Sequence, residues 1–145
     1  MSDSCCSNSS NIMLLACSGA SNLGQIANQT AVQLTHDGFG RMFCLAAIGA
    51  HINNFVKSAK DAPQILVLDG CQVGCAKKLL EHCDVPPDRY LIVSDLGIDK
   101  LMTVNWDQKQ VDGVKAAARK CYESVVDASG SADFPKCACG EAKGN

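Results

Sequence analysis

Aromatic residues, long apolar runs and an excess of charge are scarce or missing in this chain, and each absence argues against a class of function. Only 5% of the 145 residues are aromatic, which disfavours a base-stacking surface for nucleic acid. The formal net charge of −2 gives no attraction to nucleic acid or to anionic membranes. No apolar run approaches the ~20 residues of a membrane span. The sequence therefore predicts a protein without a nucleic-acid or membrane partner.

The N-terminus also lacks the features of a secretory signal. Residues 1–10 have neither a basic region nor an apolar core, so we expect a cytoplasmic protein with reduced cysteines. A chain of this length suits one domain with a real core, which we place at residues 11–128. We expect residues 1–10 and 129–145 to be flexible tails. A homodimer is the default expectation, and no protein partner is identified.

Cysteine is the residue in excess, with ten in the chain. In a cytoplasmic protein, clustered cysteines are more often metal ligands or catalytic groups than disulfide partners. Some should be inert, because a free thiol packs like a small apolar side chain. We predict that role for Cys83 and Cys121, which fall on the apolar stripes of predicted helices.

Two further cysteine pairs lie in the predicted tails. Cys5 and Cys6 are adjacent, which is an awkward arrangement for chelating one ion. Cys137 and Cys139 flank a single alanine in polar sequence. Soft thiol ligands of this kind suit metals such as Cu(I) or arsenic(III), and this is the hypothesis we attach to the C-terminal pair.

Short apolar runs alternate with helix-like periodicity along the chain. This alternation predicts βαβ units and an α/β fold: a three-layer open sandwich with a mostly parallel sheet of four or slightly more strands, flavodoxin-like or Rossmann-like. The predicted strands cover residues 12–16, 42–48, 65–68 and 89–93, and the predicted helices cover 23–34, 52–59, 76–82 and 108–128.

Thiols follow the first and third predicted strands. Cys17 precedes a helix N-terminus, whose N–H groups and dipole favour an anion such as a thiolate. Cys71 lies in an Asp-Gly-Cys turn, and Cys75 follows after three residues. In a flavodoxin-like sheet these two strands are neighbours and ligands bind at their carboxyl ends. We therefore expect the two thiol loops to lie side by side.

Other residues near these loops have less specific signals. Cys44 lies inside the second apolar run, so a buried structural thiol and a metal ligand both stay open. Asp69 is predicted to shape the turn or support the site rather than to bind metal. His51 stands at the start of a predicted helix, as a capping or surface residue. The Cys17 loop has no Walker-type lysine, no GxGxxG pattern and no arginine to close a phosphate loop.

Three chemistries fit these thiols. Zinc takes four sulfur or nitrogen ligands, and the Cys71–Cys75 spacing falls within its usual range. A thiol–disulfide or persulfide-handling enzyme would use Cys17 as a nucleophile of low pKa and Cys71 or Cys75 as the resolving thiol. Four cysteines also hold iron–sulfur clusters.

Three motifs together resemble the small bacterial and archaeal DGC-domain proteins, over about residues 11 to 120. This likeness implies a zinc ion held by Cys17, Cys44, Cys71 and Cys75, in a structural or metal-handling role without a defined activity. Gln72 stands where the family often has proline, which changes the stiffness of the turn and not the number of ligands. The motifs are Cys17-Ser18-Gly19-Ala20-Ser21-Asn22 with Gly24-Gln25, Cys44-Leu45-Ala46 with Gly49-Ala50-His51, and Asp69-Gly70-Cys71 with Gly74-Cys75-Ala76.

Overall fold

A parallel four-stranded sheet organises residues 11–123, the part of the chain that the computed structural model describes. The strand order is β2-β1-β3-β4, and every neighbouring pair is parallel. The predicted α/β fold with β1 beside β3 is thus confirmed. The elements are β1 (Ile12–Ala16), α1 (Asn22–His36), β2 (Arg41–Met42), α2 (Leu45–Gly49), α3 (Asn53–Lys60), β3 (Gln64–Asp69), α4 (Cys75–His82), β4 (Arg89–Ile92), the 3-10 helix η1 (Val93–Leu96) and α5 (Gln108–Glu123).

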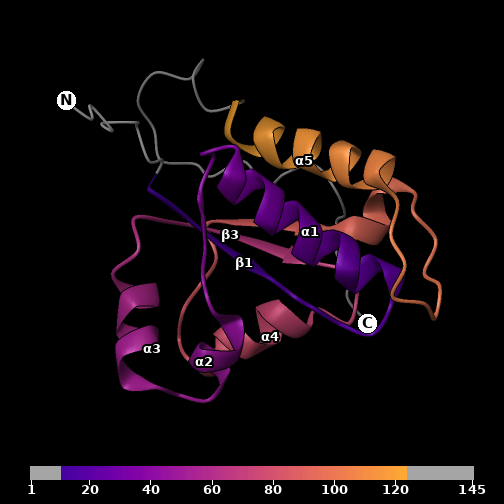
Figure 1. Cartoon of the computed structure of the whole chain (residues 1–145). Coiled ribbons are helices and arrows are strands. Elements are labelled where there is room, and N and C mark those ends of the chain that lie inside the picture. The colour runs from indigo at the N-terminus through magenta and orange to yellow at the C-terminus, as the bar shows by residue number, and fades with distance from the viewer. Residues whose placement is uncertain (1–10, 124–145) are drawn as a thin grey trace, which may run out of the picture.

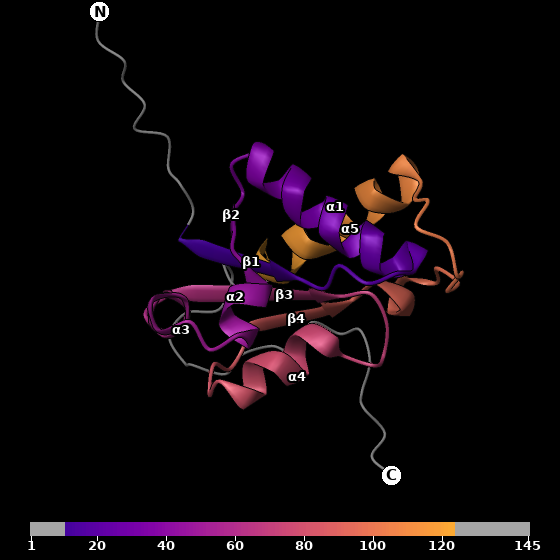
Figure 2. The same ribbon diagram turned by 60° about the horizontal axis from the view of Figure 1, so that its bottom comes forward.

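Helices cover both faces of the sheet, as Figures 1 and 2 show: α1 and α5 lie on one face, and α2, α3 and α4 lie on the other. β1 and the middle of β3 are continuously apolar because successive side chains point into opposite cores. Leu14 packs with the residues of α1 and α5, whereas Leu15 packs with those of α2, α3 and α4. No helix among residues 11–123 is long and apolar enough to cross a membrane.

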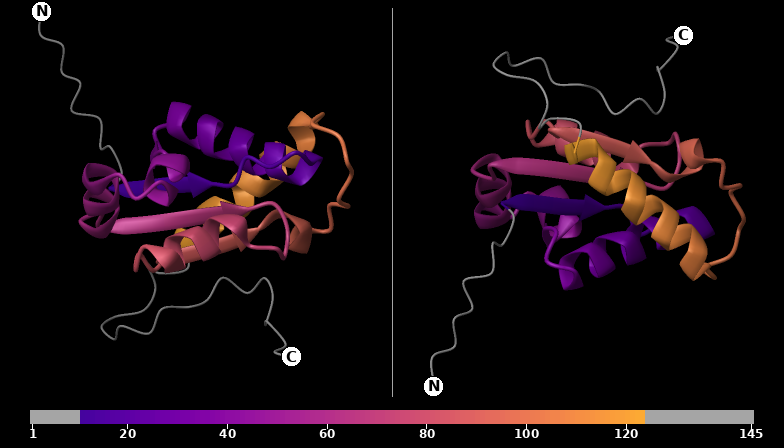
Figure 3. Two further views of the ribbon diagram at one scale, coloured as in Figure 1. Left: turned by 90° about the horizontal axis from the view of Figure 1, so that it is seen from below. Right: turned by 90° about the horizontal axis from the view of Figure 1, so that it is seen from above.

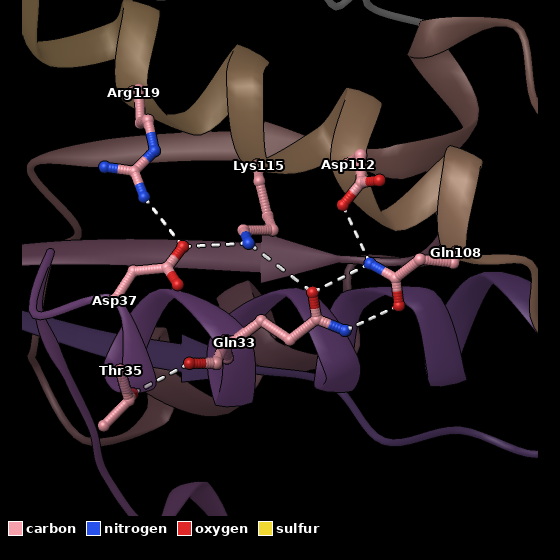
Figure 4. Close-up of polar contacts among 8 residues, drawn as sticks. Gln33, Thr35, Asp37, Gln108, Asp112, Lys115 and Arg119 are labelled. Atoms are coloured by element: carbon pink, nitrogen blue, oxygen red, sulfur yellow. Dashed lines mark hydrogen bonds and ion pairs between the residues drawn. The ribbon is translucent and has the colours of Figure 1, made fainter.

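A polar seam joins α1 to α5 along the outer side of their layer (Figure 4). The carboxylate of Asp37, just after α1, lies 2.8 Å from both Lys115 and Arg119. Gln33 and Gln108 exchange amide hydrogen bonds of 3.0 and 2.9 Å. The two cations hold the pKa of Asp37 below its usual value. The seam adds fixed pairings to the apolar contact between these helices.

The second predicted strand is wrong for most of its length. The run over residues 42–48 reads as one strand, but β2 is only Arg41–Met42 and the chain then turns into helix α2. Phe43 still donates its N–H to Leu14 O at 2.9 Å, so the pairing with β1 ends there. Cys44 caps α2 and is exposed, which rules out a buried structural thiol.

Smaller differences concern element ends. The fourth predicted strand extends to residue 93, but β4 ends at Ile92 and the 3-10 helix η1 follows directly. The predicted tails, residues 124–128 of the last predicted helix, and Cys5, Cys6, Cys137 and Cys139 lie outside the described residues. Cys83 is a buried free thiol, as predicted, whereas Cys121 is buried but disulfide-bonded and so is not the free thiol that was expected.

Candidate thiol site at the carboxyl edge of the sheet

Three neighbouring strands lead to cysteines at one edge of the sheet. Cys17 comes directly after β1. One residue separates Cys44 from the end of β2, and one residue separates Cys71 from the end of β3. Cys75 is the first residue of α4, which starts from the same edge. Figure 3 shows β1 and β3 pointing in the same direction, toward the loops that precede α1 and α4. We call Cys17, Cys44, Cys71 and Cys75 the thiol edge; all four are free cysteines in the structure.

Burial divides the thiol edge into two pairs. Cys17 and Cys71 are half-buried, whereas Cys44 and Cys75 are exposed. Cys17 packs against the apolar cores on both faces of the sheet, and Cys71 packs against the core under α1 and α5. The half-buried pair therefore belongs to the rigid part of the fold, and the exposed pair lies at helix starts on its surface.

Asp69 builds the start of α4. Its carboxylate is buried and accepts hydrogen bonds from Ala76 N at 2.9 Å and Lys77 N at 3.1 Å. Tyr90 donates its hydroxyl to the same carboxylate at 3.0 Å. Helix α4 needs this partner because its N-cap, Gly74, has no side chain and adopts a left-handed backbone, with φ 65°. Asp69 thus shapes the turn into α4, and both of its carboxylate oxygens accept hydrogen bonds.

Gly70 connects the loops after β1 and β3. It donates its N–H to Cys17 Sγ at 3.0 Å and accepts from Ser94 N at 3.0 Å. A Cβ atom at this position would lie 2.8 Å from Gly24 N, so only glycine lets the start of α1 come this close. The Asp-Gly-Cys triplet therefore combines a helix cap, a close backbone approach and a thiol in three residues.

Burial, together with nearby negative charge, opposes a thiolate at Cys17 in the metal-free chain. Burial raises the pKa of Cys17 to about 11, and the charges of Asp69 and Cys75 add to this effect. The hydrogen bonds from the backbones of Gly70 and Gly19 lower the pKa but are outweighed. Cys17 is consequently protonated at neutral pH, which argues against the alternative in which it is a nucleophile of low pKa. A bound cation would relieve this crowding of negative charge.

Two residues at the site escaped the sequence prediction. Lys100 Nζ lies 3.5 Å from Cys71 Sγ, although 29 positions separate the two residues. Asn22, the first residue of α1, bonds to the distant residues Asp99 and Leu101. Ser21 is the actual cap of α1. Of two adjacent polar residues at a helix start, one can cap the helix and the other can bond elsewhere, as Ser21 and Asn22 do. No pattern in the sequence points to Lys100.

A preformed metal cage is not present among residues 11–123, where no three His, Cys, Asp or Glu side chains cluster closely enough to hold an ion. The donor chemistry nevertheless fits zinc. Four thiols stand at one edge, Gly70 N–H already bonds to one sulfur, and Lys100 faces another. Binding would require the side chains of the exposed pair, Cys44 and Cys75, to move toward the half-buried pair.

His51 lies near a different thiol. Its backbone is left-handed, with φ 56°, and its Nδ1 is 3.8 Å from Cys83 Sγ. Cys83 donates its S–H to Ile48 O at 3.3 Å. These contacts close the end of α2 against α4 and place the imidazole near Cys83, not beside a thiol-edge sulfur.

Comparison with known proteins places this architecture in a family. The DGC domain matches residues 13–118. The anaerobic and virulence modulator AnvM of Pseudomonas aeruginosa is 36% identical over 88 residues, which cover 61% of this chain and 67% of AnvM. No solved structure matches the chain.

Proposed function

Because the chain belongs to the DGC-domain family, we propose that it binds one zinc ion at the thiol edge, through Cys17, Cys44, Cys71 and Cys75, in a structural or metal-handling role. The observation that carries this proposal is the delivery of cysteines to one sheet edge by the adjacent strands β2, β1 and β3. Zinc supplies positive charge where the folded chain gathers thiols and a buried carboxylate.

The residues have separate tasks in this proposal. Cys17 and Cys71 are held by the cores, so they provide the fixed half of the ligand set. Cys44 and Cys75 provide the movable half from the starts of α2 and α4. Zinc binding would displace the proton that Cys17 holds at neutral pH. The ion would then link the loops after three strands, which stabilises the fold around it.

A regulatory use of this site is consistent with its chemistry. AnvM is named as a modulator, and a thiolate metal site responds both to metal supply and to oxidants. In a cytoplasmic chain, which is our proposed location, the thiols would stay reduced and available to metal. The metal ion is the one partner that the proposal requires.

Single Cys→Ser variants test the ligand set. Cys17→Ser, Cys44→Ser, Cys71→Ser and Cys75→Ser should each reduce zinc below about one ion per chain, measured by elemental mass spectrometry on protein purified without oxygen. Cys83→Ser is the matched control, because this buried thiol contacts Ile48 O and not the thiol edge, and it should keep its zinc. Unchanged zinc in all four variants would refute the proposal, and a brown protein containing iron would favour the iron–sulfur alternative.

A further inference from the structure

The loop between η1 and α5 returns to the thiol edge, and Asn22 holds it there. Asn22 N donates to Leu101 O at 3.2 Å, Leu101 N donates to Asn22 Oδ1 at 2.7 Å, and Asn22 Nδ2 donates to Asp99 O at 2.9 Å. Asn22 is the first residue of α1 and is buried. In Figures 1 and 3 this loop, drawn in orange, runs beside the start of α1.

Hydrophobic burial anchors only the start of this loop, where Ile98 packs against the core under α1 and α5. The large apolar side chains that follow are exposed, with Met102 at 85% and Val104 at 60% of their full accessibility. Asn22 therefore contributes three hydrogen bonds to the backbone of residues 99–101. One is to Asp99, before Lys100, and two are to Leu101, after it. One buried side chain thus fixes the backbone that carries an exposed lysine.

The backbone held in this way aims Lys100 at a sulfur. Lys100 Nζ lies 3.5 Å from Cys71 Sγ, within the range of an N–H···S hydrogen bond. Lys100 is the charged side chain that the structure places on a thiol-edge sulfur among residues 11–123, whereas the donors to Cys17 are backbone N–H groups, those of Gly70 and Gly19. A surface ion pair usually contributes little free energy, so the contribution of this contact depends on how much negative charge the sulfur of Cys71 carries.

Zinc binding would make that charge large. Four thiolates on a divalent cation leave a net charge of −2, and the buried carboxylate of Asp69 stands behind them. Groups that donate to ligand atoms tune the affinity of a metal site, typically by a factor of ~10–100. An ammonium group, a compact point charge with rotatable donors, is suited to stabilise the thiolate of Cys71.

We propose that Lys100, presented by Asn22, is a positioning residue of the thiol edge: it offsets the negative charge of the zinc–thiolate group and slows loss of the metal. This inference rests on the proposed zinc site but adds a residue that supplies no ligand. The pair also gives the site a means of control, because any partner that draws the exposed loop away from Asn22 removes the cation from Cys71.

Zinc affinity measured by competition with a chromogenic chelator tests this proposal. Lys100→Met should raise the zinc dissociation constant by roughly 10-fold or more, and Lys100→Arg, which keeps the charge, should stay near the wild-type value. Lys60→Met is the control for net charge, because Lys60 is exposed at the end of α3, and it should change little. Asn22→Ala should reproduce most of the Lys100→Met effect, and the double variant should be no weaker than the weaker single variant, as expected for residues that act as one unit.

The outcomes separate this inference from the zinc site itself. If wild-type protein holds zinc and Lys100→Met matches Lys60→Met, the role of Lys100 is overturned while the four-cysteine site stands. If Lys100→Arg weakens zinc as much as Lys100→Met does, charge compensation is overturned. If wild-type protein holds no zinc, both proposals fail together. Lys100 is exposed, so its substitution leaves the fold intact and keeps the test decisive.

Discussion

Gly70 is the residue at which the thiol loops and helix α1 meet. Its missing side chain leaves room for the backbone of Leu23 and Gly24, each about 2.8 Å from where a Cβ would lie. Its N–H also donates to Cys17 Sγ. The middle position of the Asp-Gly-Cys triplet therefore serves the packing of the fold and the polarity of the site at once.

Gly70→Ala should destabilise the chain by about 1–3 kcal/mol, because the added methyl group meets backbone atoms that cannot easily yield. Unfolding in urea, followed by circular dichroism, measures the loss. Gly19→Ala is the matched control, since a Cβ there meets nothing within 4 Å. Equal stability of the two variants would show that α1 can move away from Gly70 without cost.

Burial is the main cause of the raised pKa of Cys17, and the charge of Asp69 adds to it, an effect that can be measured in metal-free protein. Replacing the carboxylate in Asp69→Asn removes a negative charge near the thiol, so the pKa should fall from about 11 and alkylation by iodoacetamide should begin at lower pH. The midpoint of the pH profile, followed on the Cys17 peptide by mass spectrometry, is the readout. Asp61→Asn, at the exposed end of α3, should leave the midpoint unchanged; a shift there, or none in Asp69→Asn, would contradict this account.

Among the elements, α1 and α5 are joined by a seam whose strength should depend on pH. The pKa of Asp37 is lower in the folded chain than its ordinary value of 3.8. Its contribution is therefore present above the unfolded-state pKa and disappears as the pH falls through the lower folded-state pKa. Asp37→Asn should lower the melting temperature at neutral pH and have little effect near pH 2.

Salt provides the control for that prediction. Asp37 and its partners Lys115 and Arg119 are partly exposed, so a high salt concentration should screen their attraction and shrink the difference between variant and wild type. A difference that persists unchanged in ~1 M salt, or at low pH, would mean that packing and not charge accounts for it.

Most elements could be predicted from the sequence, because their signals are local. β1, β3 and β4 coincide with short runs that are rich in apolar residues, and Ser21 provides the side-chain cap for α1, which begins at Asn22. The run over residues 42–48 failed because a continuous apolar run fits a buried strand and a buried helix equally well. The chain uses it as a two-residue strand followed by helix α2.

The site was predictable only in outline. The rule that ligands gather at the carboxyl ends of parallel strands was enough to bring Cys17 and Cys71 to one edge. The supporting contacts were not predictable, because each joins distant positions: Tyr90 reaches Asp69, and Lys100 reaches Cys71. Such contacts depend on the path of loops, for which the sequence holds no periodic signal.

For the molecule as a whole, the thiol edge lies where both apolar cores end. Cys17 contacts the core on each face of the sheet, so a metal ion held there would connect the two layers of helices through the strand ends. Its binding free energy would add to the stability of the entire fold. The same arrangement explains why a metal-free chain must keep Cys17 protonated, with its pKa near 11.

X-ray absorption at the zinc edge, on protein purified without oxygen, tests the central claim most directly. The account predicts about one zinc per chain, surrounded by four sulfur atoms at about 2.3 Å. Replacement of one sulfur by a lighter ligand is expected in Cys44→Ser, and none in Cys83→Ser. A zinc environment of nitrogen and oxygen atoms in the wild-type protein, or no stoichiometric zinc, would contradict a site built from Cys17, Cys44, Cys71 and Cys75.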